Sequence, residues 1–578
     1  MENTEISRIF DEIAELLDLK GENSFKVKAY QKAARTVDSL AQPLSDFKSI
    51  KELTQIPGIG QSIAEKIMEI VATGDCRLHQ ELKSEFPPQI LVLLSVPALG
   101  PKKAAILYRE LGIGNLEELK AAAQADTISG IKGFGAKTQE NILKGIELVT
   151  STSGRKSIAQ ALPLARELLK ILSQLPQVSA ASEAGSLRRR KETIGDIDLL
   201  VASEQPQAVM DYFVKLPWVK KIIAHGETKS SVLTAQGLQI DLRVVGEASY
   251  GAALQYFTGS KDHNVELRGR AKDLELKINE YGVFRQNQPN SLAGRTEEEV
   301  YKTIGLPYIP PEIREARGEI EAALKHQLPR LVDLKEIKGD FHIHSNFSDG
   351  SADIGEMARA AKALGYQYLV LTDHSQSLKI AGGLTPERLR EQQKQIDEWQ
   401  EKLKPFRIFK GTEIDILADG SLDYPPEVLK SFDIVIASIH SLMKMDKAAM
   451  TRRIITAVEN PYTTILGHPT GRLIGQRDEF EVDWEAIYPV CAKNQVALEI
   501  NAFPDRLDLR DIYCQRAKEF GCIFTIGTDS HSTGHLHHME YGVFVARRGW
   551  LEKSEILNCL PLEELEKWIQ QRKKKLKI

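Results

Sequence analysis

The chain has 578 residues, of which 42% are hydrophobic and 27% charged, and its formal net charge at pH 7 is -4. These proportions are typical of soluble globular proteins and exclude a wholly disordered chain, while the length predicts about four domains. No apolar run approaches the roughly 18 residues of a membrane-spanning helix, so no membrane partner is expected. The N-terminal segment lacks a basic region and a cleavage site, which predicts no signal peptide. Five scattered cysteines without a CxxC pair favour a reducing cytoplasm and argue against a cysteine zinc site.

Residues 1–150 are expected to form short helices, because apolar residues from Ile6 to Leu17 recur at helical spacing. Three similar turns lie in this region, and each precedes an amphipathic helix. Their glycines are Gly58, Gly60, Gly100, Gly133 and Gly135. A turn of this kind exposes backbone N–H groups at a helix N-terminus, which can bind a DNA phosphate without reading its sequence. Ordinary helix capping remains an open interpretation of any single turn, whereas three together favour DNA binding.

From about Leu162 the pattern changes to strands and helices, which predicts an α+β unit, and its domain is expected to span residues 151–248. Asp196 and Asp198 alternate on a predicted strand, so both carboxylates face one side, and Asp241 offers a third from a neighbouring strand. Three close carboxylates repel one another and favour hard cations. We therefore expect two Mg²⁺ ions that clamp the oxygens of a phosphoryl transfer. Taken alone, an Asp-x-Asp pair is also typical of a solvated turn.

A Gly-Ser-Leu-Arg-Arg segment precedes these aspartates. Gly185 lets the backbone approach a phosphate, Ser186 can donate to terminal phosphates, and Arg189 can offer a bidentate fork. Together with the aspartates, this segment favours nucleotide binding over a solvated turn. Residues 249–315 return to helical and irregular patterns, and the charged segment 316–335 is expected to be a helical connector or linker.

Residues 336–578 contain seven short apolar runs that each end in polar residues, and helical stretches separate most of them. Repeated strand–helix units predict parallel strands in a barrel or a doubly wound sheet. In a barrel, the chemistry lies where the strands end. Metal-ligand residue types gather at those ends or close by: His342, His344, Asp349, His374, Glu413, His440, His468, Asp529 and His531. Nine of the 13 histidines lie from His342 onward, which also points to metal chemistry.

A set of histidines and carboxylates without cysteine favours Mn²⁺, Zn²⁺ or Fe²⁺. Nine ligands exceed what one ion needs, so two or three ions are expected, with Glu413 as a candidate bridge. Such a site polarises a phosphoryl oxygen and lowers the pKa of a bound water. His535, His537 and His538 follow the last strand and are expected to lie at the surface or just behind the ligands.

This C-terminal part resembles the PHP (polymerase and histidinol phosphatase) family of metal-dependent phosphoesterases over roughly residues 336–570. The motifs that carry the resemblance are HxH at 342–344, the DH at 373–374, GTEID, SIH, GHP and GTDSH, in this order. The resemblance implies that the nine residues form a trinuclear site with no ligand replaced, and hence an active hydrolase. It also implies that Asp373 and Glu499 lie just behind the ligands.

The segment from Gly185 to Asp241 resembles the nucleotidyltransferase superfamily, and the segment from Tyr256 to Asn264 resembles the nucleotide-binding element of family X DNA polymerases. The resemblance assigns Tyr256 and Phe257 to the sugar of an incoming deoxynucleotide. The further residues that it implies are Gly259 in the same element, Asn264 at the base and Arg268 at the template. Lys261 departs from the family's eukaryotic polymerase beta, which has an acidic residue there. Without the resemblance, an aromatic pair before glycine is equally typical of a core or a turn.

The N-terminal turns resemble helix-hairpin-helix motifs, although Ala98 replaces the favoured glycine of the second copy. In the beta-like polymerases a lysine at the place of Lys66 forms a Schiff base with an abasic sugar. Lys26 and Lys32 match basic residues that hold a downstream 5′-phosphate. A solvated helix lysine is an equally open interpretation of Lys66, so lyase activity is kept as a hypothesis.

The order of these parts resembles bacterial and archaeal family X DNA polymerases over nearly the whole chain. The resemblance implies all-α helix-hairpin-helix domains, an α+β nucleotidyltransferase core with a polymerase beta-like palm, and a distorted (β/α)7 PHP barrel. The expected domains are a DNA-end domain (1–85), a fingers-like domain (86–150), the palm (151–248), a thumb-like nucleotide-binding domain (249–315), the linker (316–335) and the PHP domain (336–578).

The activity that the resemblance implies is that of a monomeric, cytoplasmic and nucleoid-associated repair polymerase. It would fill short gaps in DNA with dNTPs and Mg²⁺. The PHP site, with Mn²⁺ or Zn²⁺, would act as a 3′–5′ exonuclease, with incision at abasic sites as a further activity. Two alternatives stay open. The chain is mainly a PHP phosphodiesterase that polymerase-like arms deliver to DNA, or it is a DNA-end scaffold with vestigial sites. The complete carboxylate and ligand sets argue against the second.

Overall fold

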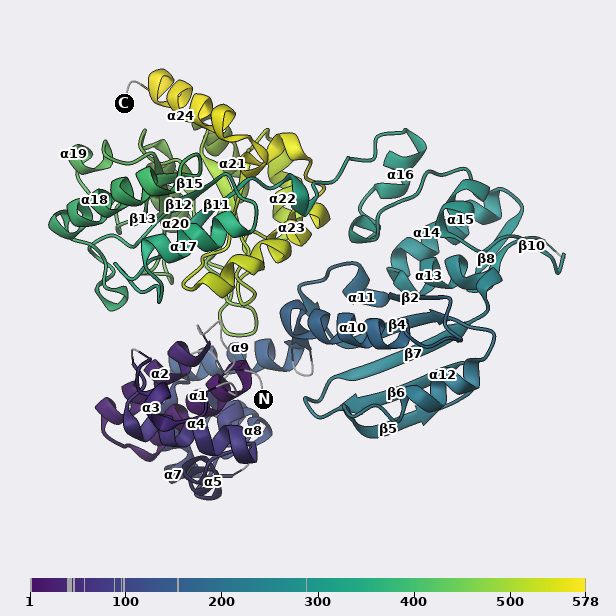
Figure 1. Cartoon of the computed structure of the whole chain (residues 1–578), viewed down its shortest axis with the longest axis horizontal. Coiled ribbons are helices and arrows are strands. Elements are labelled where there is room, and N and C mark those ends of the chain that lie inside the picture. Colours follow the sequence, from purple (N-terminus) through teal and green to yellow (C-terminus); the bar gives the residue numbers. More distant parts are fainter. Residues whose placement is uncertain are drawn as a thin grey trace.

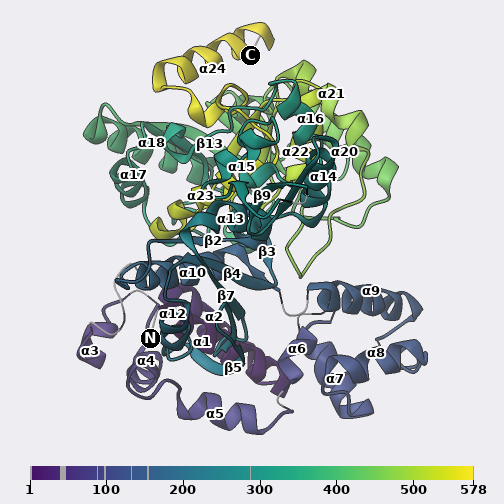
Figure 2. The ribbon, with the colours of Figure 1, turned by 90° about the vertical axis from the view of Figure 1, so that its right-hand side faces the viewer.

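The computed structural model describes residues 3–576 except 39–43, 45–46, 57, 88, 95, 97–98, 132, 153–154 and 287. Figure 1 shows the N-terminal helices, a central α+β part and a C-terminal barrel. In both Figure 1 and Figure 2 the last helix, α24 (Leu562–Leu576), lies at the edge of the barrel that faces away from the N-terminal helices. In the described part of the chain, no helix is long and apolar enough to cross a membrane.

The described residues of the N-terminal region form helices and no strands, as expected. Its helices are α1 (Asn3–Lys20), α2 (Ser24–Asp38), α3 (Ile50–Leu53), α4 (Gln61–Thr73), α5 (Arg77–Ser84), α6 (Ile90–Leu94), α7 (Pro101–Leu111), α8 (Leu116–Gln124) and α9 (Ala136–Thr152). The apolar face of α1, including Ile6, Phe10 and Ile13, is fully buried and shares one hydrophobic cluster with Ile67 of α4. Burial of this periodic face, rather than helix propensity, stabilises such short helices.

The palm is built on a five-stranded sheet with the strand order β2-β4-β7-β6-β5. These strands are β2 (Ala180–Glu183), β4 (Asp196–Ala202), β7 (Gln239–Val245), β6 (Lys229–Thr234) and β5 (Val219–His225). Helices α10 (Ile158–Leu172) and α12 (Pro206–Phe213) pack against it, and a short helix, α11 (Gly185–Arg188), follows β2. Strands β1 (Lys156–Ser157) and β3 (Thr193–Ile194) form a separate pair. β4 and β7 run parallel in the centre of the sheet, which brings residues from distant parts of the sequence side by side.

The thumb-like part combines helices with a small antiparallel sheet of order β10-β9-β8. Its elements are η2 (Glu247–Ser249), α13 (Tyr250–Thr258), α14 (Lys261–Asp273), β8 (Leu276–Asn279), β9 (Gly282–Arg285), β10 (Ser291–Ala293), α15 (Glu297–Thr303) and η3 (Pro311–Ile313). The following segment, expected to be a linker, contains α16 (Glu319–Leu324) and η4 (Leu334–Glu336). It packs closely, because Glu319 and Ala323 are fully buried and Arg317 pairs with Asp511 of the barrel domain.

The C-terminal domain is a seven-stranded parallel sheet in sequence order, which confirms the expected repetition of strand–helix units. Its strands are β11 (Gly339–Ile343), β12 (Tyr368–Leu371), β13 (Arg407–Asp415), β14 (Ile434–Ser438), β15 (Ile465–Leu466), β16 (Ala497–Asn501) and β17 (Phe524–Gly527). A parallel bridge between Ile343 and Ser530 joins the first strand to the segment after the last, so the sheet closes into a barrel and is not doubly wound.

Helices surround this barrel. One of them, α23 (Met539–Arg548), lies on the side that faces the palm in both views (Figures 1 and 2). They are α17 (Ile354–Ala363), η5 (Lys379–Ala381), α18 (Pro386–Leu403), α19 (Pro426–Leu429), α20 (Lys447–Glu459), α21 (Trp484–Asn494), α22 (Asp511–Glu519), η6 (Thr533–His538), α23 (Met539–Arg548), η7 (Lys553–Glu555), η8 (Leu557–Cys559) and α24. Because all strands are parallel, their carboxyl ends meet at one rim, and the polar residues that follow them meet there too.

Two candidate active sites

The palm aspartates come together through the register of two parallel strands. Asp198 of β4 lies directly opposite Asp241 of β7, and Asp196 precedes Asp198 by two residues on the same face. One ligand atom from each of the three carboxylates lies within 4.8 Å of the others. Alternation along a strand therefore supplies two of these groups, and strand pairing supplies the third.

The charges of this group match a site for cations. Burial, together with Asp196 and Asp241, raises the pKa of Asp198 to about 7. Burial also raises the pKa of Asp241, but hydrogen bonds from Lys229 and Gln239 outweigh this effect and lower it below its ordinary value. The Lys229 ammonium lies 2.7 Å from Asp241 Oδ2 and partly compensates the negative charge. Oxygen donors of this kind suit Mg²⁺, and the repulsion that raises the pKa of Asp198 is what a divalent ion would relieve.

A glycine is required at position 185 because any larger residue would collide with Asp198. Gly185 adopts a φ of +58°, and a Cβ added there would lie 2.0 Å from Asp198 Oδ2. The glycine thus makes room for a carboxylate, a contact that the sequence did not reveal. Ser186 is half-buried beside it. The Arg189 guanidinium, expected to hold phosphates, donates to the Thr258 carbonyl and, at 3.1 Å, to Glu315 Oε1.

The aromatic pair after the palm lies at the end of α13. The rings of Tyr256 and Phe257 meet edge to face at 5.1 Å, and the Arg243 guanidinium lies 4.2 Å from the centre of the Phe257 ring. Gly259 ends the helix with a φ of +70°. Asn264 is buried, and its amide donates to the Tyr256 carbonyl at 2.8 Å, so it fixes the backbone of the aromatic pair.

A groove of about 960 Å³ adjoins Tyr256. Its basic lining residues are Arg268, Lys272, Lys277 and Arg285. The exposed Arg268, expected at the template, therefore lines this basic groove next to the aromatic pair.

The glycines of the N-terminal turns lie where helices begin. Gly60 and Gly100 are the N-cap residues of α4 and α7, and Gly135 directly precedes α9. Gly58 and Gly133 adopt φ values of +97° and +94°, which favour glycine. Ala98 lies outside the described residues.

The three lysines expected to act on a 5′ end are exposed or half-buried. The ammonium of Lys66 donates to the hydroxyl and the carbonyl oxygen of Ser62, at 3.1 and 3.2 Å, one turn earlier in α4. Lys26 pairs with Glu22 at 3.4 Å. The Lys32 side chain runs past Gly58, where an added Cβ would lie 3.1 Å from Lys32 Cε. Lys32 therefore lies against the first glycine turn.

The barrel rim gathers the expected C-terminal ligands into three overlapping groups, in each of which the ligand atoms lie within 4.8 Å of one another. The groups are His344, Asp349, His374 and His531; His342, His344 and Asp529; and His374, Glu413 and His440. The ninth residue, His468, places Nε2 2.8 Å from Glu413 Oε1. His344 and His374 each belong to two groups, so the first group shares one histidine with each of the other two. Such sharing is expected for metal ions that are bound side by side.

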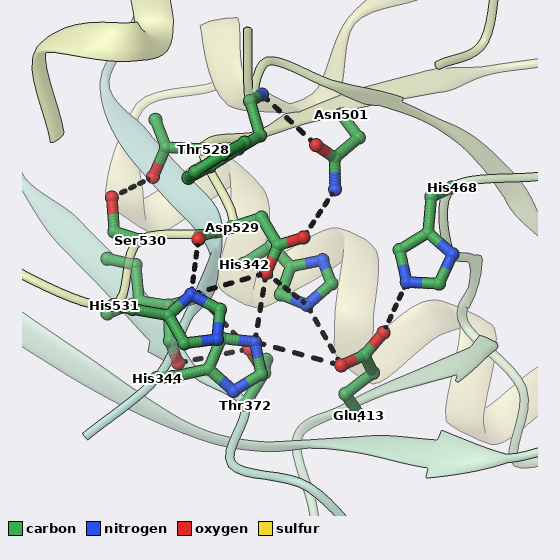
Figure 3. A network of polar contacts seen from close by, with 12 residues as sticks. His342, His344, Thr372, Glu413, His468, Asn501, Thr528, Asp529, Ser530 and His531 are labelled. Atoms are coloured by element: carbon green, nitrogen blue, oxygen red, sulfur yellow. Dashed lines mark hydrogen bonds and ion pairs between the residues drawn. The ribbon is translucent and has the colours of Figure 1, made fainter. Parts of the chain in front are cut away.

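Glu413 connects the two sides of this cluster, as Figure 3 shows for His342 and His468. Its Oε2 lies 2.9 Å from His374 Nδ1 and 3.4 Å from His342 Nε2. Its Oε1 lies 3.3 Å from His440 Nε2. The two oxygens of one carboxylate thus face different histidines, which is the geometry of the bridge expected from the sequence.

Several possible ligand atoms of the cluster are buried and form no well-aligned hydrogen bond with the described residues, even where an ionic partner lies close by. They are His342 Nε2, both ring nitrogens of His344, Glu413 Oε2 and His468 Nδ1. Burial lowers the pKa of His374, but Glu413 and Asp349 outweigh this effect and raise it to about 10. The carboxylates thus favour positive charge at His374, which divalent ions would supply. Unsatisfied buried donors together with carboxylates fit divalent ions.

Further polar residues orient the ligands. His342 Nδ1 and Glu499 Oε1 are 2.6 Å apart, and Glu499 Oε2 accepts from the His468 backbone N–H at 2.6 Å. Asp415 lies 2.5 Å from His440 Nδ1. Sequence reasoning missed Asp415, although it follows Glu413 by two residues on β13 and strand alternation signals that both share a face.

Asp373 contacts the loop next to the ligands. It accepts hydrogen bonds from Ser345, Ser348 and Gln392, and so it fixes the loop after β11. Asn501 donates to Asp529 Oδ2 at 3.0 Å (Figure 3) and thereby holds a ligand in position.

Comparisons with known proteins match several separate parts of the chain. Family models match the helix-hairpin-helix domain (residues 1–76), the SAM-like helix-hairpin-helix tandem (90–147), the DNA polymerase beta thumb (253–315) and the PHP domain (340–502). The DNA polymerase/3′-5′ exonuclease PolX of Bacillus subtilis (strain 168) is 41% identical over 572 residues, which cover 99% of this chain and 100% of that protein.

Two further relatives each match one part of the chain. DNA polymerase lambda of Rattus norvegicus is 25% identical over 54% of this chain and 56% of its own length. A probable phosphatase of Thermoanaerobacter sp. (strain X514) is 28% identical over 41% of this chain and 96% of its own length.

Proposed function

The chain belongs to the family X DNA polymerases that carry a C-terminal PHP domain, and from this premise we propose that its two sites perform opposite reactions at a DNA 3′ end. The palm extends the strand with deoxynucleotides, and the barrel shortens it by hydrolysis. The observation that carries this proposal is the presence of two separate sets of possible metal ligands, one of carboxylates and one mainly of histidines. We also propose that the protein acts as a monomer.

The residues proposed to extend DNA are those of the palm. Asp196, Asp198 and Asp241 would hold two Mg²⁺ ions, and Gly185 keeps the space beside Asp198 open. Divalent ions, when bound at either site, supply positive charge that polarises the reacting phosphoryl group. Tyr256 and Phe257 would lie along the sugar of the incoming nucleotide. Their edge-to-face packing fixes the wall against which that sugar rests.

Some expected nucleotide contacts need another assignment. The Arg189 guanidinium is engaged with Thr258 and Glu315, so we propose that it shapes the loop around Ser186 instead of gripping phosphates directly. Asn264 would act in the same indirect way through the Tyr256 carbonyl. Gly259 would let the chain turn between helices α13 and α14.

The residues proposed to shorten DNA are the nine at the barrel rim, which would hold two or three Mn²⁺ or Zn²⁺ ions. Glu499 and Asp415 keep the rings of His342 and His440 in the orientation that ligation requires. The reaction would release the terminal nucleotide of a 3′ end, and the same chemistry could incise at an abasic site. Together, the two sites suit a polymerase that fills short gaps during DNA repair and trims the ends it extends.

The N-terminal helices are proposed to hold the DNA. The backbone N–H groups at the starts of α4, α7 and α9 would bind phosphates, and Lys26 and Lys32 would hold a 5′-phosphate. Lys66 is proposed as the Schiff-base nucleophile of a lyase reaction. Borohydride trapping on DNA with an incised abasic site tests this point, because only a Schiff base is reduced to a stable crosslink. Absence of a crosslink, or its persistence in Lys66→Arg, would refute the assignment.

The main test uses a 5′-labelled primer on a gapped template, with dNTPs and either Mg²⁺ or Mn²⁺. We expect Asp196→Ala/Asp198→Ala to abolish extension and keep shortening, and His342→Ala/His344→Ala to do the reverse. If the wild-type protein only shortens the primer, the polymerase assignment fails and the chain acts mainly as a phosphodiesterase with DNA-binding arms. Loss of both activities in either variant would contradict two independent sites.

A further inference from the structure

A small cavity lies between the palm and the barrel domain, and none of the residues that line it belongs to either set of possible metal ligands. Its volume is about 150 Å³, several times the share of one water molecule in liquid water. The palm lines it with the segment after α11, and the barrel domain lines it around the start of α22 and along α23. We call it the interdomain cavity. Its basic lining residues are Arg155, Arg190 and Lys191 from the palm and Arg510 and Arg548 from the barrel domain.

Positive charge exceeds negative charge around this cavity. Two carboxylates also line it, Glu192 and Asp511, but both are already engaged with arginines. Glu192 lies 2.7 Å from Arg472. Asp511 Oδ2 lies 2.7 Å from Arg548 and 3.0 Å from Arg317. Burial raises the pKa of Asp511, but these two arginines outweigh this effect and lower it to about 2. The lining carboxylates therefore leave little negative charge for the other cations.

Lys191 lies within this excess of positive charge. Its ammonium is 3.6 Å from Glu315 Oε1, which is too far for a good hydrogen bond. Glu315 is also shared with Arg189 at 3.1 Å and with Arg548 at 2.9 Å. Burial and the nearby Arg548 lower the pKa of Lys191 below its ordinary value. An anion beside this lysine would favour its charged form.

Two arginines at the cavity have N–H groups left for an anion. The Nε of Arg510 is buried and has no hydrogen-bond partner among the described residues, while its Nη1 lies 3.3 Å from Glu479. The Nε and Nη1 of Arg317, which pairs with the lining Asp511 through Nη2, are buried without a partner in the same part of the structure. Buried donors without partners are rare in folded proteins, and an ion that binds to them accounts for such groups.

We infer that the interdomain cavity binds one small phosphate anion, inorganic phosphate or pyrophosphate, through cationic side chains of both domains. A guanidinium group suits this ligand, because its planar fork matches two oxygens of a phosphoryl group. The small volume favours a free anion over the backbone of a DNA strand. Arg190 and Lys191 directly follow the Gly-Ser-Leu-Arg-Arg segment, so the bound anion would fasten this part of the palm to α22 and α23. The site does not depend on the proposed reactions, although strand extension would release pyrophosphate.

The first test is calorimetric titration of the full chain with pyrophosphate and with inorganic phosphate in metal-free buffer, in which the palm carboxylates repel anions. We expect Lys191→Met and Arg510→Met each to raise Kd about tenfold, because each removes a charged hydrogen-bond donor. Lys191→Arg should keep the wild-type affinity. Arg516→Met is the matched control, because Arg516 is exposed on α22 and does not line the cavity. No binding by the wild-type protein, or an unchanged Kd in both Met variants, would overturn the inference.

The second test separates the cavity from other cationic parts of the chain. Protonated histidines at the barrel rim also attract anions, so the titration is repeated with His342→Ala/His344→Ala, in which Kd should stay unchanged. Saturating phosphate should slow hydrogen–deuterium exchange in residues 188–193 and 508–514 of the wild-type protein, and should not do so in Lys191→Met. Loss of binding in the histidine variant, or slower exchange only at the barrel rim or the N-terminal turns, would contradict the inference.

The last test distinguishes a free anion from a phosphate of DNA. An oligothymidylate should bind with a Kd that Lys191→Met and Arg510→Met leave within about twofold of the wild-type value. An equal loss of affinity for pyrophosphate and for the oligothymidylate would assign the cavity to the DNA backbone and overturn the choice of a free anion. Phosphate should also raise the melting temperature of the wild-type protein more than that of Lys191→Met/Arg510→Met, because an anion that binds only the folded state stabilises it by mass action. Equal rises would count against the site.

Discussion

Arg548, near the end of α23 in the barrel domain, donates a hydrogen bond of 2.6 Å to the backbone carbonyl of Arg189 in the palm, 359 residues away. The same guanidinium contacts Glu315 at 2.9 Å and Asp511 at 2.7 Å. Since Glu315 also accepts from Arg189, one group of charges around the buried Arg548 joins the palm loop, the thumb-like part and the barrel domain. The hydrolytic domain therefore helps to hold the loop that the incoming nucleotide would meet.

Arg548→Met should weaken nucleotide binding in the palm, because it removes the contact that supports the Arg189 backbone and leaves Glu315 partly unpaired. We expect KM for dNTP in gap filling to rise about fivefold to tenfold, with kcat for extension less affected. Arg166→Met is the control, since the Arg166–Glu540 pair also joins palm and barrel but is more exposed. A lower melting temperature with an unchanged KM would show that Arg548 only fastens the domains together.

Gly185→Ala should abolish most extension, because its Cβ would lie 2.0 Å from Asp198 Oδ2 and displace that carboxylate. Displacement of a reacting group by this much costs on the order of 100-fold in rate. Gly237→Ala is a matched control, since Gly237 also has a positive φ of +76° but has no atom within 4 Å of an added Cβ. Exonuclease activity should persist in both variants. Equal losses of extension in the two variants would attribute the effect to backbone strain.

Glu499→Gln should reduce the exonuclease through the metal, because the Glu499 carboxylate fixes the ring of His342 from behind. Changes at such positions cost about 10-fold to 100-fold in metal affinity or activity. A Mn²⁺ titration of the exonuclease should shift to higher concentration, while extension stays unchanged. The exposed Glu485→Gln serves as the comparison. If added Mn²⁺ restores nothing, Glu499 has another role than orienting the ligand.

The stability of the N-terminal helices should depend on pH through His79. This buried histidine contacts Asp75 at 2.7 Å and Glu12 at 3.0 Å. Burial lowers the pKa of His79, but the two carboxylates outweigh this effect and raise it above 6.5. Because the folded value exceeds the unfolded one, the charged histidine stabilises the fold fully below about pH 6.5. This contribution is lost as the pH rises through the folded value.

His79→Gln should therefore destabilise α1 and α5 by about 1.5 kcal/mol at acidic pH and by less at alkaline pH. Hydrogen–deuterium exchange of these helices in the full chain, corrected for intrinsic rates, measures the difference. His225→Gln, in the palm, should leave both helices unchanged. A destabilisation that grows with pH would contradict the stated direction of the shift.

Much of the fold and of the barrel site could be predicted, because both follow from short-range patterns. His342 on β11 and His344 directly after it alternate along the chain, and the remaining ligands lie at or near strand ends in sequence order, where parallel strands must bring them together. Asp415 was predictable by the same rule and was overlooked. The close packing of residues 316–335 against the rest of the protein was harder to predict from the sequence, because their charged side chains are typical of a linker. The buried Glu319 contacts His263, which lies far away in the sequence.

The sequence by itself determined which residues carry the chemistry, because alternation along a strand and the residue types that metals require are local properties. Only the tertiary structure decided what those residues touch. The pairing of Asp198 with Asp241, the contact of Glu499 with His342 and the support of Arg189 by Arg548 all join distant segments. Such contacts depend on strand register and on how the domains pack. The interdomain cavity likewise exists only because the palm and the barrel domain pack against each other and bring Lys191 towards Arg510.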